Sequence, residues 1–169
     1  MPNPSPLGRS VLFREFTEAD LDSLLSAAAS RRFASGQVIY SEGEPNTSLW
    51  VIRSGKVRVS RRVAKEDVPF GDMKAGETFG EMSVIDGGGS ATATLTAVDD
   101  SEVLELPKVD LEKCLTGNSD LSAKFWRAIA RELRDRLSRT SDGLRNYVDI
   151  NRALIDNPNF REFYSLCHR

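Results

Sequence analysis

Short β-prone runs alternate with single glycines between residues 31 and 107. The runs cover residues 38–40, 49–52, 57–59 and 103–106. Runs of this length favour strands, because the bounding glycines permit the tight turns that join them. Val57 and Val59 alternate with polar residues, which predicts one buried and one exposed face. Ser54 and Gly55 stand between two runs and predict a tight hairpin. The pattern as a whole favours a compact antiparallel roll or barrel.

A short amphipathic helix is expected before these strands. Thr17 precedes an acidic first turn, and leucines recur at helical spacing through residues 17–29. Residues 1–9 contain three prolines and few apolar side chains, so we expect them to form a flexible tail.

The hydrophobic pattern becomes helical from residue 109 onward. Positions separated alternately by three and four residues form a heptad seam at Ala130, Leu133, Leu137, Thr140, Leu144, Tyr147, Asn151 and Leu154. Such a seam predicts that a helical region over residues 109–156 pairs with its copy in a homodimer. The interface is expected to consist of Leu133, Leu137, Thr140, Leu144 and Tyr147. Pro158 breaks the pattern, so residues 157–169 are expected to form a short terminal helix or tail.

Phe125 and Trp126 stand near the start of this helical region. We expect them to pack the helix onto the roll, in preference to forming a platform on which a base stacks. The basic side chains that follow them are expected to be a solvated helix face.

The composition is that of a soluble globular protein, with 40% hydrophobic and 28% charged residues. A net charge of −2 argues against a surface that binds nucleic acid generally. Two cysteines far apart in sequence give no disulfide framework. No apolar run approaches the ~20 residues that span a bilayer, and the first residues lack the regions of a signal peptide. We therefore expect a cytoplasmic protein without membrane association.

Nucleophilic and metal chemistry are not expected. Ser83, Ser90 and Cys114 lack a nearby histidine base, because the single histidine, His168, stands beside the last residue. His168 has no set of cysteine or carboxylate ligands around it, so no metal site is expected. The sequence thus predicts a protein that is not an enzyme and that carries no resident cofactor.

The segment 75–97 is rich in glycine and small hydroxyl residues. Gly76, Gly80 and the glycines at 87–89 allow backbone N–H groups to converge on one point and form an anion-binding concavity. Glu81 follows directly, and an ionised carboxylate only accepts hydrogen bonds, so a pair of sugar hydroxyls is a natural partner. From the residues alone, the simpler interpretation of a surface glutamate after a turn glycine stays open.

Three spaced motifs carry a family resemblance. They are Arg32-Phe33-x-x-Gly36-x-Val38-Ile39-x-x-Glu42-Gly43-Glu44, Leu49-Trp50-Val51-Ile52-x-x-Gly55-x-Val57 and Gly76-Glu77-x-Phe79-Gly80-Glu81-Met82. Together they resemble the cyclic nucleotide-binding domain, the β-roll shared by catabolite activator proteins and protein kinase A regulatory subunits. The resemblance covers roughly residues 12–150. It implies a mainly β fold with flanking helices: a double-stranded β-helix, or jelly-roll-like β-roll, followed by a long C-terminal dimerisation helix.

The resemblance also implies a phosphate-binding cassette, a short helix and loop that cradle a cyclic phosphate. Phe79, Gly80 and Glu81 match the family's Phe-Gly-Glu signature, which implies that Glu81 accepts from the ribose 2′-hydroxyl. Met82 and Ser83 match the backbone positions that begin the cassette helix.

A second match lies in the C-terminal helix. Arg136, Thr140 and Ser141 are similar to a segment of the catabolite activator protein whose Thr and Ser hydroxyls contact the purine from two subunits. A polar residue at Thr140 is equally compatible with a role in setting the register of paired helices.

The cassette departs from the family pattern at one position. Family members that bind cyclic nucleotides usually carry Arg where this sequence has Ala91, and no Lys or Arg occurs between Lys74 and Lys108. A hydrogen bond to a charged group contributes about 1.5–3 kcal/mol, so its loss implies at least roughly tenfold weaker binding. Within the cassette the sequence offers the neutral donors Ser90, Thr92 and the glycine amides, and from outside it Arg58 or Arg136.

These observations favour a non-enzymatic, bacterial-type ligand-sensing module that binds cyclic AMP or cyclic GMP weakly and signals through a partner protein. The roll with its N-terminal helix would occupy residues 10–108. Ala91 favours an alternative, a degenerate roll that serves as a protein-interaction scaffold without nucleotide. A third hypothesis is a cyclic dinucleotide held between subunits. DNA-binding relatives add a winged helix-turn-helix after the long helix, and fewer than thirty residues follow Thr140, so no DNA binding of its own is expected.

Overall fold

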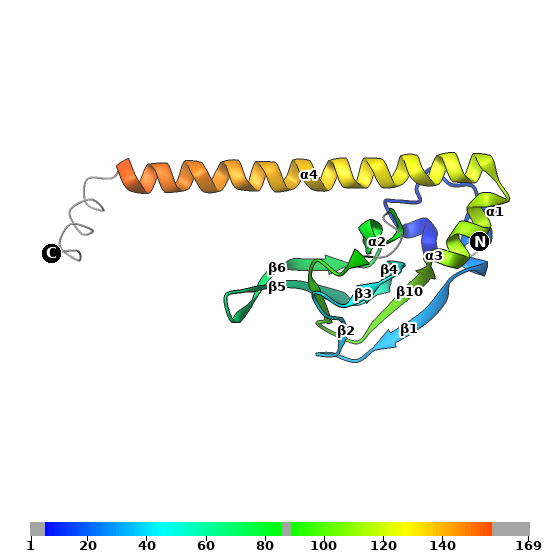
Figure 1. The fold of residues 1–169 in the computed structure, drawn as a ribbon, viewed down its shortest axis with the longest axis horizontal. Helices are drawn as coiled ribbons and strands as arrows, with labels where there is room; N and C mark the ends of the chain where they lie inside the picture. Colours follow the sequence, from blue (N-terminus) through cyan, green and yellow to red (C-terminus); the bar gives the residue numbers. More distant parts are fainter. Residues whose placement is uncertain (1–5, 86–88, 157–169) are drawn as a thin grey trace. The chain divides into compact units, whose positions relative to one another are not determined.

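The computed structural model describes residues 6–85 and 89–156, without the side chains at positions 6, 144 and 147–156. The chain divides into two compact units after Ile129, and each unit is described by itself. The first unit holds the strands and short helices, as Figure 1 shows. The long helix α4 (Ser119–Asp156) begins in the first unit and continues in the second.

The described strands form antiparallel sheets in which most neighbours are not consecutive in sequence. The first sheet has the order β1 (Ala29–Phe33), β10 (Ser101–Pro107), β4 (Ser48–Ser54) and β7 (Thr78–Phe79). The second has the order β2 (Val38–Tyr40), β9 (Thr94–Ala97), β5 (Lys56–Val63) and β6 (Glu66–Lys74). A short third ladder pairs β3 (Pro45–Asn46) with β8 (Gly89–Ser90). The chain thus passes repeatedly between two sheets, as a β-roll requires, and the fold class expected from sequence is confirmed.

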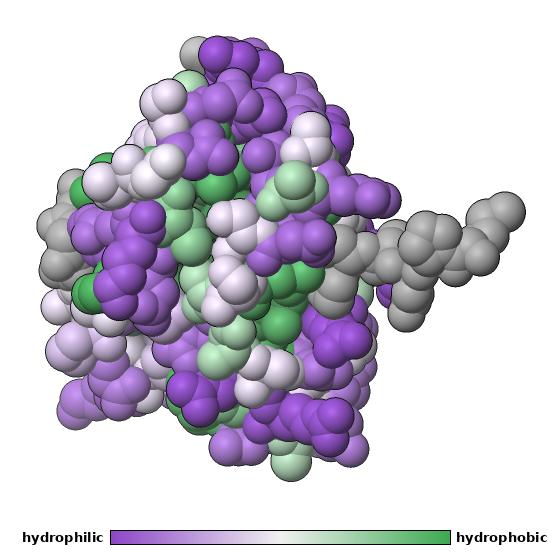
Figure 2. Space-filling model, turned by 90° about the vertical axis from the view of Figure 1, so that its right-hand side faces the viewer, coloured by the Kyte–Doolittle hydropathy of each residue, from purple (hydrophilic) through white to green (hydrophobic). Residues whose placement is uncertain are grey.

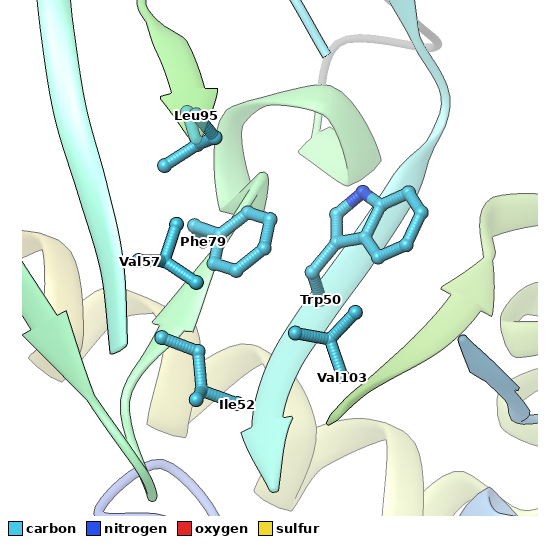
Figure 3. Close-up of a cluster of buried hydrophobic side chains, with 6 residues drawn as sticks. All are labelled: Trp50, Ile52, Val57, Phe79, Leu95 and Val103. Carbon is cyan, nitrogen blue, oxygen red and sulfur yellow. The ribbon is translucent and has the colours of Figure 1, made fainter. Parts of the chain in front are cut away.

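The two four-stranded sheets enclose one hydrophobic core. Figure 3 shows side chains of the first sheet facing those of the second; the cluster consists of Trp50, Ile52, Val57, Phe79, Leu95 and Val103. The rings of Trp50 and Phe79 stack with centroids 5.9 Å apart and planes inclined by 7°. Burying an apolar side chain of this size stabilises the fold by about 1.5–3 kcal/mol. The core therefore fixes β7, the strand that leads into the glycine-rich segment.

The predicted hairpin at Ser54 and Gly55 is wrong. The strands on either side, β4 and β5, lie in different sheets and do not pair with each other. Gly55 has φ +87°, and a Cβ built there would lie 2.3 Å from the Ser101 hydroxyl oxygen. The glycine is needed because the chain crosses from one sheet to the other past Ser101, a long-range contact that the local turn pattern does not encode.

The strand β6 was not predicted, because its sequence contains Pro69 and Gly71 and few apolar residues. It lies at the edge of the second sheet, where a proline is tolerated since no neighbour needs its missing N–H group. The β5–β6 register shifts between Val59 and Ser60, which pair with Gly71 and Pro69. Phe70 is thus the unpaired residue of a β-bulge, and its side chain is 63% exposed.

The N-terminal part of the chain packs more tightly than expected. Residues Pro6–Arg9 form a short 3₁₀ helix, and the Leu7 side chain is fully buried. This part of the predicted flexible tail is therefore ordered, because Leu7 supplies an apolar anchor that the prolines around it obscured.

The expected helix after Thr17 is confirmed as α1 (Glu18–Ser26). Thr17 and Asp20 form a reciprocal capping box, with donor–acceptor distances of 3.0 and 3.2 Å. Lys124 of α4 donates to the same Asp20 carboxylate at 3.0 Å. Burial raises the pKa of Asp20, but the hydrogen bonds from Thr17 and Lys124 outweigh it and hold the pKa below its ordinary value.

The C-terminal helical region begins as two helices. The helix α3 (Lys108–Thr116) ends at Gly117, and Asn118 accepts from the Leu121 N–H at 3.0 Å to start α4. Phe125 is fully buried, as expected, whereas the prediction of a core position is wrong for Trp126, which is 41% exposed. The two residues differ in burial because consecutive helical positions point to different faces. The Trp126 ring still packs edge-on against the Phe125 ring, with centroids 5.2 Å apart.

The hydropathy of the surface shown in Figure 2 agrees with a sequence in which 28% of the residues are charged. The face drawn in Figure 2 is mostly hydrophilic, and hydrophobic side chains show only in patches between charged ones. Among the described residues, none of the helices combines the length and apolar composition that crossing a bilayer requires.

Candidate ligand-binding site

The predicted binding residues of the first unit fall into two short stretches. We call residues 78–83 the entry turn and residues 89–92 the exit ladder. The entry turn comprises β7, Gly80 and the first half of α2 (Glu81–Ile85). Its strand pairs with β4 through Phe79 opposite Trp50, so the hydrophobic core holds it directly.

Gly80 makes the entry turn possible. It has φ +83°, and a Cβ built there would lie 2.4 Å from the Ser48 carbonyl oxygen and 2.9 Å from the Asn46 amide nitrogen. The left-handed conformation and the close approach of β4 both exclude a side chain. The Ser83 N–H then donates to the Gly80 carbonyl at 3.1 Å, which closes the first turn of α2.

Glu81 is the charged residue of the entry turn, and it is deeply buried, with 1% of its surface exposed. The Thr78 hydroxyl, itself 3% exposed, donates to its carboxylate at 2.7 Å. The interpretation of Glu81 as a solvated surface glutamate is therefore wrong. A buried carboxylate needs hydrogen-bond donors, since an unpartnered buried charge costs several kcal/mol.

Met82 and Ser83 follow on the same helix but differ in environment. The Met82 side chain is 51% exposed, whereas Ser83 is 7% exposed. The Ser83 hydroxyl accepts from the Asn46 side-chain amide at 2.9 Å. Sequence reasoning did not single out Asn46, because a polar residue before a strand has no motif that marks it as buried.

The exit ladder is held mainly by backbone bonds. Gly89 and Ser90 pair with Asn46 and Pro45, and both side-chain positions are exposed. The Ala91 N–H donates to the Glu44 carbonyl and its own carbonyl accepts from Gly43, each at 2.8 Å. The Ala91 side chain is 7% exposed and Thr92 is exposed. The position at which the resemblance leads us to expect an arginine thus has both backbone groups bonded and carries a buried methyl group.

The guanidinium of Arg58 is already paired, so it is not free to bind a phosphate in the candidate site. It lies in β5, and its guanidinium donates two hydrogen bonds to the Asp72 carboxylate of β6, at 2.9 and 3.2 Å. These hydrogen bonds raise the pKa of Arg58 and lower the pKa of Asp72. Recruiting Arg58 to a phosphate would require breaking this bidentate pair.

The C-terminal candidates belong to the second unit. Arg136 donates to Glu132 at 3.3 Å, and the Thr140 hydroxyl donates to the Arg136 carbonyl at 3.0 Å. Thr140 and Ser141 are exposed, Leu137 is 68% exposed, and Leu133 is half-buried. The side chains of the other two predicted interface residues, Leu144 and Tyr147, lie outside the described residues.

The described residues contain no cluster of three or more His, Cys, Asp or Glu side chains that fits a metal ion. Ser83 bonds to an amide, Ser90 is exposed, and Cys114 lies against the Ser23 carbonyl at 3.5 Å. His168 and the glycines at 87 and 88 lie outside the described residues.

Two sheets wound around a hydrophobic core, with a short helix inserted after a glycine turn, define a β-roll. The family model described as "Cyclic nucleotide-binding domain" matches residues 30–118, which is more than half of the chain. The chain therefore belongs to the cyclic nucleotide-binding domain family.

The curated relatives include a transcriptional regulator and a protein named for binding cyclic GMP. The chain is 26% identical over 144 residues to the CRP-like cAMP-activated global transcriptional regulator of Mycobacterium tuberculosis, covering 84% of this chain and 62% of that protein. It is 34% identical over 125 residues to cyclic GMP-binding protein C of Dictyostelium discoideum, covering 73% of this chain and 5% of that protein. The chain thus spans less than two thirds of either relative.

A solved structure supports the same assignment. The N-terminal domain of a transcriptional regulator from Streptomyces coelicolor superimposes with a TM-score of 0.70 at 28% identity. The superposition covers 80% of this chain and 94% of that domain. The similarity therefore extends over most of the chain.

Proposed function

We propose that this chain is a non-enzymatic sensor module that binds cyclic AMP or cyclic GMP with low affinity and passes the signal to a partner protein in the cytoplasm. The observation that carries the proposal is the entry turn: a glycine with φ +83° followed by a glutamate that is 1% exposed. Family membership supports a cyclic nucleotide as the ligand, and two relatives are named for cAMP and cyclic GMP.

Each part of the site has a role in this proposal. Glu81 accepts a hydrogen bond from the ribose 2′-hydroxyl, and the backbone N–H groups of Met82 and Ser83 would face the cyclic phosphate. The Ser83 N–H would share its hydrogen between the phosphate and the Gly80 carbonyl, to which it donates at 3.1 Å. Ser90 and Thr92 add neutral donors from the exit ladder, where both are exposed. Ala91 leaves the phosphate without a charge-assisted hydrogen bond, so we expect binding at least roughly tenfold weaker than in a family member with Arg.

Isothermal titration calorimetry with cyclic AMP and cyclic GMP tests the proposal. The wild type should bind one of them saturably, and Glu81→Gln should weaken binding at least about tenfold because the amide cannot replace a charged acceptor. Glu66→Gln, at an exposed position of β6, is the matched control and should bind like the wild type. Equal affinities for Glu81→Gln and the wild type would remove the role of Glu81.

Dimerisation through α4 is a further part of the proposal. Leu137 lies on the heptad seam and is 68% exposed, so its side chain is available to pack against a second helix. In a dimer this seam would bury Leu133, Leu137 and Thr140, and the Thr140 and Ser141 hydroxyls would contact a bound purine. In light scattering, Leu137→Asp should give the monomer mass and the exposed, off-seam Ser138→Asp the dimer mass. A wild-type monomer would contradict the interface.

Ala91 favours one alternative, a degenerate roll that serves as a protein-interaction scaffold without nucleotide. Ala91→Arg restores the family's charge, and Thr92→Arg adds the same charge one residue away as a control. A sensor that already binds should gain about tenfold in cyclic AMP affinity from Ala91→Arg and less from Thr92→Arg. If only the Ala91→Arg variant binds cyclic AMP, the result favours the protein-interaction scaffold. If the wild type binds a cyclic dinucleotide tightly, the result favours the cyclic dinucleotide as the natural ligand.

A further inference from the structure

Asn46 occupies a buried position between the two stretches that form the candidate site. It is 6% exposed and belongs to β3, which was not expected from the sequence to take part in binding. We propose that Asn46 is the positioning residue of the site, an inference that rests on the proposed function. Asn46 holds the entry turn and the exit ladder at a fixed position relative to each other. The proposal concerns geometry, and Asn46 itself need not touch the ligand.

The side-chain amide of Asn46 makes four hydrogen bonds. Its nitrogen donates to the Ser83 hydroxyl at 2.9 Å and to the Ser48 carbonyl at 3.1 Å. Its oxygen accepts from the Ser48 N–H and from the Trp50 ring N–H, each at 3.2 Å. Two donors and two acceptor sites are the full capacity of a primary amide, so every position is used. A fully satisfied buried network of this kind specifies one arrangement of the groups that it joins.

These bonds connect three parts of the fold. Ser83 belongs to α2, Ser48 starts β4, and Trp50 stacks on Phe79 in the core. The amide nitrogen also lies 2.9 Å from the place where a Gly80 side chain would begin. Beside the direct packing of Phe79, the first turn of α2 is therefore linked to the aromatic core through the side chain of Asn46.

The backbone of the same residue fixes the other stretch. Asn46 pairs with Gly89 in the β3–β8 ladder, and the neighbouring Pro45 pairs with Ser90. Both stretches are thus attached to Asn46. The entry turn is bonded to its amide side chain, and the exit ladder pairs with its main chain. A displacement of Asn46 would move the donors of the exit ladder relative to Glu81.

The chemistry requires an amide at this position. Aspartate has the same shape but donates no hydrogen bond, so it would lose the contact to the Ser48 carbonyl and bury a charge. It would keep the Ser83 contact only with the Ser83 hydroxyl as the donor. Alanine would leave the Trp50 ring N–H and the Ser48 N–H without these partners. Ser83→Ala is a milder change, because it removes only the acceptor that links Asn46 to α2.

Hydrogen exchange of the ligand-free protein tests the positioning directly. In Asn46→Ala and Ser83→Ala, peptides that cover residues 79–85 should exchange about threefold to tenfold faster, the effect of one lost hydrogen bond. Ser10→Ala is the matched control, since Ser10 is a buried serine, 1% exposed, that accepts from the Leu12 N–H at 3.3 Å. It should leave residues 79–85 unchanged. Unchanged exchange in Ser83→Ala, or acceleration spread evenly over the roll, would overturn the positioning role.

Titration with cyclic AMP tests the consequence for binding. Ser83→Ala should raise Kd about threefold to tenfold, and the double variant Asn46→Ala/Ser83→Ala should bind no more weakly than Asn46→Ala. Ser10→Ala should keep the wild-type Kd even where it lowers the melting temperature as much as Ser83→Ala does. Fully additive losses would show that Ser83 does not act through Asn46. A wild type that binds no cyclic nucleotide would defeat the proposed function alone, and the exchange experiment would still decide the positioning role.

Discussion

The entry turn and the exit ladder lie at the two sides of the same candidate site, but they are stabilised differently. In the entry turn Thr78, Phe79, Glu81 and Ser83 are buried, and side-chain hydrogen bonds hold it. In the exit ladder Ser90 and Thr92 are exposed, and backbone bonds hold the chain. The difference shows that the geometry of the entry turn is built into the core, whereas the exposed side chains of the exit ladder are neutral and Ala91 between them is a buried methyl group.

The largest difference between the two stretches should appear at their glycines. Gly80→Ala should lower the free energy of unfolding by about 2–5 kcal/mol, because it combines a left-handed backbone with overlap on the Ser48 carbonyl. Gly89→Ala should change it by less than about 0.5 kcal/mol, since no atom lies within 4 Å of a Cβ built there. Urea denaturation measures both values, and similar losses in the two variants would contradict the comparison.

A smaller effect is expected at the two threonines. Thr78→Val removes the buried hydroxyl that donates to Glu81 and should cost about 1–3 kcal/mol. Thr92→Val, at an exposed position of similar shape, should stay within about 0.5 kcal/mol of the wild type. The same denaturation experiment applies. A Thr78→Val protein as stable as Thr92→Val would mean that the Thr78–Glu81 bond contributes nothing to the entry turn.

The smallest effect should come from Asp20, which lies outside both stretches and contributes to the acid sensitivity of the roll. Its pKa is lowered in the folded protein, so its stabilising contribution is complete above the unfolded value of about 3.9 and is lost as the pH falls through the folded value. Asp20→Asn should therefore be about 0.5–1.5 kcal/mol less stable at pH 7, and the gap should close at low pH. Denaturation at a series of pH values checks this, with the exposed Asp22→Asn as control; a gap that persists in acid would contradict it.

Much of the fold could be predicted from the sequence, because its local patterns agree with its tertiary structure. The cap at Thr17 and the β-prone runs became α1, β2, β4, β5 and β10. The failures lie where a distant contact decides the local conformation. Gly55 turns past Ser101 into another sheet, and Pro69 is tolerated only because β6 is an edge strand.

In the candidate site, too, some residues could be predicted from the sequence, whereas others depend on contacts between distant parts of the chain. Gly80 and Glu81 could be selected from the sequence because they match the family's Phe-Gly-Glu signature, whereas the local pattern alone left a surface glutamate open. The burial of Glu81, and the role of Asn46 between Ser83 and Trp50, depend on strands that are far apart in the chain. No local pattern distinguishes Asn46 from a solvated turn residue, since its partners become neighbours only when β3, β4 and α2 meet.

A crystal structure of the protein soaked with cyclic AMP would test most directly whether this roll still recognises a sugar-phosphate without the cassette arginine. We predict the ribose 2′-hydroxyl within about 2.5–3.0 Å of the Glu81 carboxylate, and the phosphate between the N–H groups of α2 and the exit ladder. Nucleotide bound elsewhere on the roll, or side chains of the protein filling the space beside Glu81 at saturating nucleotide, would contradict it.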